Sequence, residues 1–103
     1  MRCRSCKPVP DEIRRAAGLI ERRWAVSILY ASSEGAVRFN EFRQALGTVP
    51  PRTLAQRLVE LEEAGIVDRV VVDARPPRVE YRLTRDGRRL ITVVDALVRF
   101  ASV

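Results

Sequence analysis

Two cysteines close to the start of the chain, Cys3 and Cys6, have the spacing Cys-x-x-Cys. Arg2, Arg4 and Lys7 surround them, and neighbouring cations favour the thiolate form that reacts with oxidants and electrophiles. A closed zinc site needs about four ligands, so this pair could hold a metal only if two chains contributed their tails. The spacing is therefore compatible with a redox-responsive thiol pair, and the alternative is a tail whose cysteines have no specific role.

The other residue types give little support to catalysis. Histidine is absent from the sequence, which removes the commonest general base and the commonest transition-metal ligand. The glycines are isolated from one another, so the sequence has no glycine-rich phosphate loop. We therefore expect no enzymatic activity and no cofactor.

The charge of the chain indicates the class of its partner. Lysine and arginine total 19 against 13 acidic residues, which gives a net charge of +6 and a pI of about 10.6. All of these cations except Lys7 are arginine, whose planar guanidinium suits phosphates and guanine edges. The expected partner is nucleic acid. The alternative is that arginine content reflects genome composition or thermal adaptation.

The length of 103 residues predicts one domain with a single core. We expect a cysteine-containing tail at 1–10 and one domain at 11–103. No apolar run approaches the roughly 20 residues that a membrane span needs, and the first residues contain no apolar signal region. The expectation is a cytoplasmic protein with no membrane partner.

Apolar periodicity predicts two helices in the first third of the chain. Asp11 is a candidate N-cap for the first of them. The second is expected at about 22–33, with Trp24, Ile28 and Leu29 on one face.

The middle of the chain predicts a helix-turn-helix at about 38–64. Its first helix ends at Gly47, and the link that follows contains Pro50 and Pro51, which fit the first turn of the next helix. Thr48 or Val49 is then the expected boundary residue.

The second helix of this pair, at 51–64, has two different faces. One is a stripe of leucines at helical spacing, which predicts the buried side: Leu54, Leu58 and Leu61. The other face carries cationic and polar groups near its start and glutamates near its end. This gradient suits a helix whose first turns enter the major groove, with contacts from Arg52, Thr53, Gln56 and Arg57. The alternative is an ordinary surface helix of mixed charge.

Two β-rich segments follow and predict a wing at about 66–83. In the second segment Val79, Tyr81 and Leu83 alternate with polar residues, as in a half-buried strand. Arg75 lies in the connection and Arg78 at the start of the returning strand. The wing, 73–79 in particular, is expected to contact the DNA backbone or the adjacent minor groove.

Thr84 is expected to cap a last helix at about 84–102. Its apolar arc covers roughly 180°, wider than a helix needs against its own core. A second copy of the chain would cover the excess, which predicts a homodimer with contacts from Leu90, Val94, Leu97 and Phe100. The alternative is a helix buried within a monomer. The expected fold class is α+β, mainly α: a winged helix-turn-helix with N- and C-terminal dimerisation helices.

The segments RRWAVSIL, RFNEFRQAL, RTLAQRLVELEEAGIVDR and PPRVEYRLTRDGRRL, in this order and spacing, resemble the HxlR-type winged-helix transcriptional regulators. The resemblance covers about residues 11–100. It implies a homodimer that binds double-stranded operator DNA, with the residues named above as contacts and Arg38 on a phosphate. It identifies no inducer.

Two departures from the family pattern affect these expectations. Pro50 and Pro51 occupy the place where the family commonly has Ser-Gln, which bears on operator preference. Asp11 stands where many members have a cysteine, and the two thiols lie further upstream. Two alternatives to an ordinary regulator stay open: a thiol- or metal-responsive sensor using Cys3 and Cys6, and a protein-interaction module that has lost DNA binding.

Overall fold

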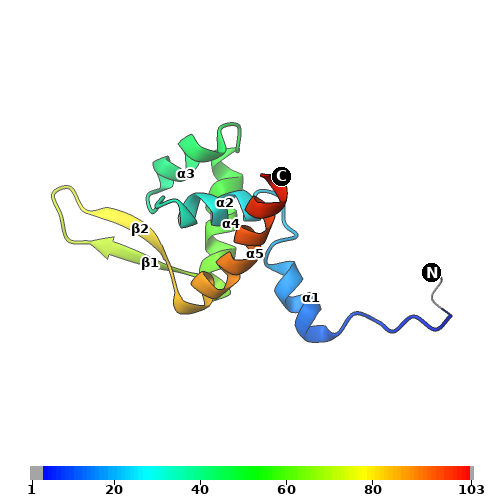
Figure 1. Cartoon of the computed structure of the whole chain (residues 1–103). Coiled ribbons are helices and arrows are strands. Elements are labelled where there is room, and N and C mark those ends of the chain that lie inside the picture. Colours follow the sequence, from blue (N-terminus) through cyan, green and yellow to red (C-terminus); the bar gives the residue numbers. More distant parts are fainter. Residues whose placement is uncertain (1–3, 103) are drawn as a thin grey trace.

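The computed structural model describes residues 4–102. Within this range the chain forms five helices and one two-stranded sheet (Figure 1). In chain order these are α1 (Asp11–Gly18), α2 (Ala25–Ser33), α3 (Phe39–Leu46), α4 (Pro51–Glu63), β1 (Val67–Val72), β2 (Arg78–Leu83) and α5 (Arg85–Ala101). None of the helices in the described range is long and apolar enough to cross a membrane.

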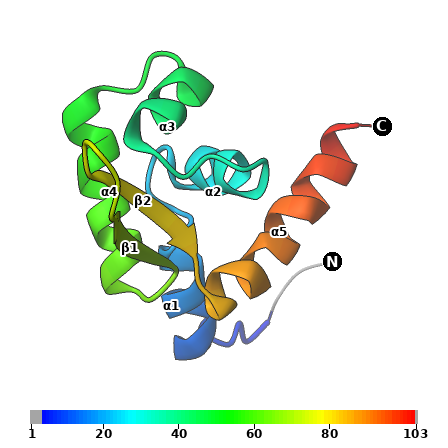
Figure 2. The same ribbon diagram turned by 90° about the vertical axis from the view of Figure 1, so that its left-hand side faces the viewer.

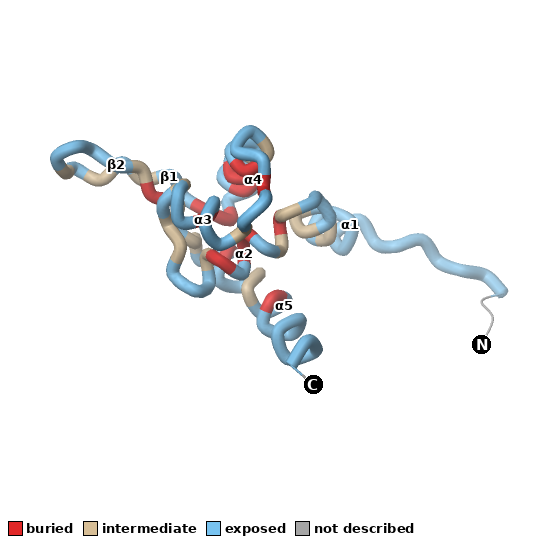
Figure 3. Tube along the Cα trace, turned by 90° about the horizontal axis from the view of Figure 1, so that it is seen from above, coloured by how far each residue is buried: buried red, intermediate tan, exposed pale blue. Residues whose placement is uncertain are grey.

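The core lies where α2, α3 and α4 meet the first half of α5. The predicted leucine stripe of α4 is confirmed, because all three leucines are buried. They pack with apolar side chains from the neighbouring helices: Ile28, Leu29, Phe42 and Val94. Figure 3 shows that burial is concentrated in this central region, whereas the segment before α1, the tip of the hairpin and the end of α5 are exposed.

The helix-turn-helix has the predicted ends with one exception. Gly47 and Gly65 follow α3 and α4 with positive φ angles of 69° and 75°, conformations that glycine adopts at little cost. Pro51 is the first residue of α4, where its missing N–H is not needed. The boundary residue is Pro50, so the prediction of Thr48 or Val49 was wrong: Val49 is buried in the core instead.

The start of α3 is stabilised by a carboxylate. Glu41 Oε1 accepts hydrogen bonds from the backbone N–H groups of Val37 (3.0 Å) and Arg38 (2.8 Å). These two bonds, Val37 first, hold the pKa of Glu41 below its ordinary value. The charged carboxylate thereby satisfies donors that the helix itself leaves without partners.

The first two helices differ from the predictions at their starts. Asp11 is the first residue of α1 and Pro10 precedes it, so Asp11 does not cap the helix through its side chain. Helix α2 begins at Ala25 because Trp24 has a positive φ of 77°, which interrupts any helix running from 22. Trp24 nevertheless packs against the core cluster, and the guanidinium of Arg23 lies 5.2 Å from the centre of its ring.

The strands β1 and β2 pair antiparallel from Val67 opposite Leu83 to Val72 opposite Arg78. Tyr81 and Leu83 pack against the core as predicted, and the backbone N–H of Tyr81 donates to the carbonyl of Val37 (2.7 Å). This bond fixes the base of the hairpin to the start of the helix-turn-helix, while the tip extends away from the body (Figure 1).

Glu80 corrects the simple alternation predicted for β2. It was expected to face solvent with its neighbours Arg78 and Arg82, and it is buried instead. Arg82 donates to Glu80 Oε1 through Nε (3.0 Å) and NH2 (2.8 Å), and Arg78 Nε donates to Oε2 (3.2 Å). These bonds, those of Arg82 first, hold the pKa of Glu80 below its ordinary value. A buried carboxylate is tolerated here because two cations flank it in sequence.

The predicted cap of α5 is confirmed. Thr84 Oγ1 accepts from the backbone N–H of Gly87 (3.0 Å) and itself donates to the carbonyl of Gly65 (2.6 Å). The first half of α5 therefore starts against the end of α4 and packs on the core. Figure 2 shows the second half continuing away from the body of the domain.

Candidate nucleic-acid interface

The exposed face of α4 carries the residues that sequence reasoning placed in a major groove. Arg52 and Gln56 are exposed and Thr53 is half-buried, all within the first two turns of the helix. The first acidic residue of α4 is Glu60, so the leading half of this face carries no negative charge. Such a face can approach the phosphates that border a groove.

Arg57 lies differently from the prediction. Its side chain is only 16% exposed, and its Nε donates to the backbone carbonyl of Arg23 (2.9 Å) while NH1 donates to Glu60 Oε1 (3.4 Å). These contacts tie α4 to the segment before α2. Arg57 therefore has an intramolecular role, and its guanidinium is not presented with those of the exposed face.

Two residues that were not singled out in the sequence complete this network. Glu60 Oε2 accepts from Gln56 Nε2 (3.2 Å) and from Arg22 NH2 (3.0 Å). The i, i+4 spacing of Gln56 and Glu60 is a signal that could have predicted their bond. The contact with Arg22 crosses 38 positions of sequence and has no local signal.

The wing brings a second group of cations to the surface. Arg75 is exposed in the connection between the strands, and Arg78 begins β2 with its side chain 42% exposed while bonded to Glu80. Arg38, exposed just before α3, and Arg78 line the same surface hollow of about 490 Å³, together with Asn40 and Gln44. The structure thus brings Arg38 and Arg78, which lie 40 positions apart, to one place on the surface.

The predicted dimer residues on α5 divide into two pairs. Leu90 packs against the core and Val94, only 2% exposed, is part of it. Leu97 and Phe100 are 44% and 82% exposed, and Val93 and Val98 are exposed beside them. The place of Val94 corrects the prediction that it faces a partner: it faces the chain's own core.

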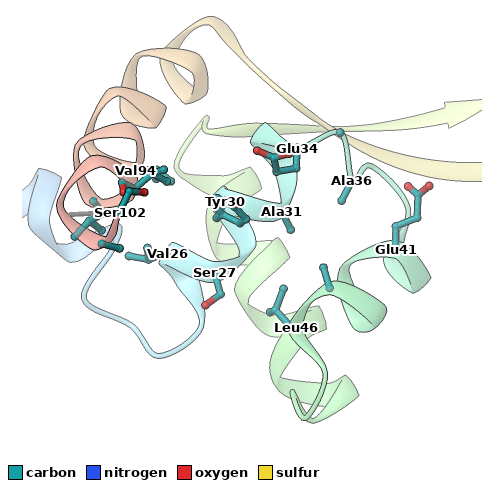
Figure 4. A pocket seen from close by; sticks show the side chains of 15 residues that line it. Val26, Ser27, Tyr30, Ala31, Glu34, Ala36, Glu41, Leu46, Val94 and Ser102 are labelled. Atoms are coloured by element: carbon teal, nitrogen blue, oxygen red, sulfur yellow. The ribbon is translucent and has the colours of Figure 1, made fainter.

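An apolar groove of about 880 Å³ adjoins this exposed part of α5. Side chains from α2, α3 and α5 line it, among them Val26, Tyr30, Leu46, Leu97 and Val98 (Figure 4). The second half of α5 lies on one side of the molecule, and α4 with the hairpin lies on the other (Figure 2).

Of the two cysteines, Cys3 lies outside the described residues. Cys6 is disulfide-bonded and exposed in the segment before α1. Along the chain, Cys6 is separated from α4 by α1, the linker containing Arg22 and Arg23, α2 and α3.

The arrangement of α3, a tight turn, α4 and then a β-hairpin with exposed arginines defines a winged helix-turn-helix, the architecture of a large class of DNA-binding proteins. Within that class the chain belongs to the HxlR family, since the model of the HxlR-like helix-turn-helix matches residues 19–103.

Known proteins similar to this chain agree with that assignment. The uncharacterized HTH-type transcriptional regulator YvaP of Bacillus subtilis is 34% identical over 88 residues, which is 85% of this chain and 82% of YvaP. The structure of the redox regulator HypR in its reduced form superposes with a TM-score of 0.80 at 35% identity, covering 89% of this chain and 91% of HypR. Diamide-treated YodB from B. subtilis superposes with a TM-score of 0.78 at 31% identity, covering 91% of this chain and 93% of YodB. The chain is thus placed among DNA-binding transcriptional regulators.

Proposed function

We propose that the protein is a homodimeric regulator that reads operator DNA with α4 in the major groove. The observation that carries this proposal is the leading half of α4, where Arg52, Thr53 and Gln56 lie on the surface with no acidic residue among them. Arginine pairs with guanine and glutamine with adenine in a major groove, and threonine can bond either a base or a phosphate.

In this proposal the wing and the start of α3 bind the phosphate backbone of the DNA. Arg38 and Arg78 line one hollow, and each presents charge to a phosphate, while Arg75 is exposed in the connection between the strands. Contacts of this kind set the position of the protein on DNA without reading its sequence. DNA as the partner implies that the protein acts in the cytoplasm.

A second copy of the chain completes the proposed regulator. The exposed apolar residues of α5 and the groove beside them form a surface that a single chain leaves uncovered. Since the second half of α5 lies away from α4 and the hairpin, two chains can join through it and leave both reading helices free (Figure 2). A two-fold axis would then place the helices about one DNA turn apart.

Binding to labelled promoter fragments tests the DNA-binding part of the proposal. We expect affinity to fall steeply with salt, with a log–log slope of about −0.9 for each phosphate neutralised. The change Arg52→Ala should reduce discrimination at one base pair of each half-site by about 1–3 kcal/mol. By contrast, Arg78→Ala should weaken binding to all sequences alike.

Arg85→Ala provides the matched control, because Arg85 is an exposed cation at the start of α5, beyond the helix-turn-helix. Arg85→Ala should leave the base preference unchanged, and it should reduce the salt slope less than Arg78→Ala does. If no fragment shows a salt-sensitive shift at low ionic strength, DNA binding through this surface is refuted.

Control of DNA binding by thiols is a second candidate function, favoured by two of the similar structures. HypR is described as a redox regulator and YodB was solved after diamide treatment, and this chain has its own pair in Cys3 and Cys6. Cations around that pair favour the reactive thiolate.

If the thiols control binding, diamide should lower operator affinity of the reduced protein by about tenfold, within the usual range of coupling between two sites. The double variant Cys3→Ser, Cys6→Ser should bind with the same affinity before and after treatment. Mass spectrometry would confirm that only the wild type is oxidised at these positions. Operator release by diamide that persists in the double variant would exclude the pair as the switch.

A further inference from the structure

Glu60, in the second half of α4, is the centre of the hydrogen-bond network behind the reading face. It lies one turn after Gln56 and its side chain is 27% exposed. Arg22 NH2 (3.0 Å) and Gln56 Nε2 (3.2 Å) donate to Oε2, and Arg57 NH1 (3.4 Å) donates to Oε1. Both carboxylate oxygens are therefore engaged.

This carboxylate is held in place from outside α4. Arg22 belongs to the segment between α1 and α2, and Arg57 is itself anchored by the bond from its Nε to the carbonyl of Arg23 (2.9 Å). Glu60 thus lies between two guanidinium groups, one on each oxygen. Its rotation is restricted, and its negative charge is neutralised close to the surface that would meet DNA.

The hydrogen bond between Gln56 and Glu60 decides which way the amide of Gln56 is oriented. A carboxylate only accepts hydrogen bonds, so the amide must face Glu60 with its nitrogen. Reversing the amide would put its oxygen against the carboxylate, where two acceptors repel each other. Gln56 Oε1 therefore faces away from Glu60, on the exposed side of the helix, and the second N–H of the amide stays available beside it.

We propose that Glu60 is a positioning residue for base recognition: it fixes Gln56 so that the side chain presents a hydrogen-bond acceptor to the major groove. This inference rests on the proposed function, in which α4 enters that groove. An acceptor selects base edges with an exocyclic amino group, N6 of adenine or N4 of cytosine. Guanine is disfavoured at the contacted position because it offers two acceptors, O6 and N7.

The test is a binding profile on operator libraries in which each base pair is randomised, measured for the wild type and for Glu60→Ala. The wild type should prefer adenine or cytosine over guanine by about tenfold at one position of each half-site. In the variant Glu60→Ala the amide is free to turn over, so this preference should fall to about twofold or less. Glu60→Gln keeps an oxygen that accepts from Gln56 and should retain more of the preference than Glu60→Ala.

Two controls separate positioning from other effects. Glu63→Gln removes a negative charge from an exposed position at the end of α4 and should raise affinity for all sequences alike, with the base profile unchanged. In a Gln56→Ala background, Glu60→Ala should have no further effect on the profile, because its action passes through Gln56. Thermal unfolding followed by circular dichroism shows whether each variant is folded.

The outcomes distinguish this inference from the proposed function. A wild type that selects no sequence refutes the proposed function. A selective wild type whose profile is unchanged by Glu60→Ala refutes only the positioning role. That role is also overturned if Glu60→Gln relaxes the preference as much as Glu60→Ala, or if Glu60→Ala still alters the profile when Gln56 is absent.

Discussion

The substitution Gly87→Ala is expected to lower the free energy of unfolding by about 3 kcal/mol, the upper part of the usual range for overpacking a core. Gly87 is buried in the first turn of α5, and a Cβ at this position would overlap the carbonyl oxygen of Ile66. The same Cβ would lie 3.0 Å from Leu83 Cδ2. A domain of this size is stabilised by only about 5–15 kcal/mol, so the loss is a large part of the total.

Neither α5 nor the carbonyl of Ile66 can move apart to make room for this Cβ without a further loss of stability. The carbonyl oxygen of Ile66 accepts from the backbone N–H of Thr84 (3.0 Å). The N–H of Gly87 donates to the hydroxyl of Thr84. Shifting α5 away from Ile66 would therefore weaken its own N-cap.

Gly18→Ala is the matched control, because Gly18 is the last residue of α1 and a Cβ there meets nothing within 4 Å. Alanine has the higher helix propensity, so this change should be neutral or stabilising by up to about 1 kcal/mol. Urea unfolding followed by circular dichroism measures both variants. Equal midpoints for Gly87→Ala and the wild type would show that α5 does not need this close approach.

Features fixed by neighbouring residues were predicted well from the sequence. The leucine stripe of α4, the glycine that ends α3, and the threonine that caps α5 each depend on residues a few positions apart. The fold class followed from their order, and the resemblance pointed to the family that the comparison then established.

Features set by distant parts of the chain were missed for a physical reason. Nothing beside Trp24 in the sequence indicates its left-handed conformation, and nothing beside Gly87 indicates the carbonyl of Ile66 against it. Glu80 looked exposed by alternation because its burial depends on two arginines that fold over it. The periodicity of α4 identified its outward face but not the contact of Arg57 with Arg23, which withdraws one arginine from that face.

The double substitution Leu97→Asp, Phe100→Asp is expected to convert the proposed dimer into a monomer and to reduce operator affinity by about 100-fold or more. These side chains are 44% and 82% exposed in a single chain, so their replacement leaves the core of that chain intact. In a dimer they would be buried, and burial of each large apolar side chain contributes about 1.5–3 kcal/mol. A carboxylate in the same place carries a desolvation penalty instead. Each monomer would then bind one half-site without the gain in affinity that comes from linking two DNA-binding domains.

For this explanation to hold, the oligomeric state of the protein and its affinity for the operator must change together. Sedimentation equilibrium gives the mass, and the operator shift is measured on the same samples. Thr92→Asp is the control, since Thr92 is exposed on α5 and lies about 140° around the helix from Leu97. It adds one of these two negative charges to the same helix, and the variant should remain dimeric with nearly unchanged affinity. A doubly substituted protein that stays dimeric would exclude this end of α5 from the interface. A monomer that still binds the full operator tightly would show that DNA recognition does not depend on dimerisation.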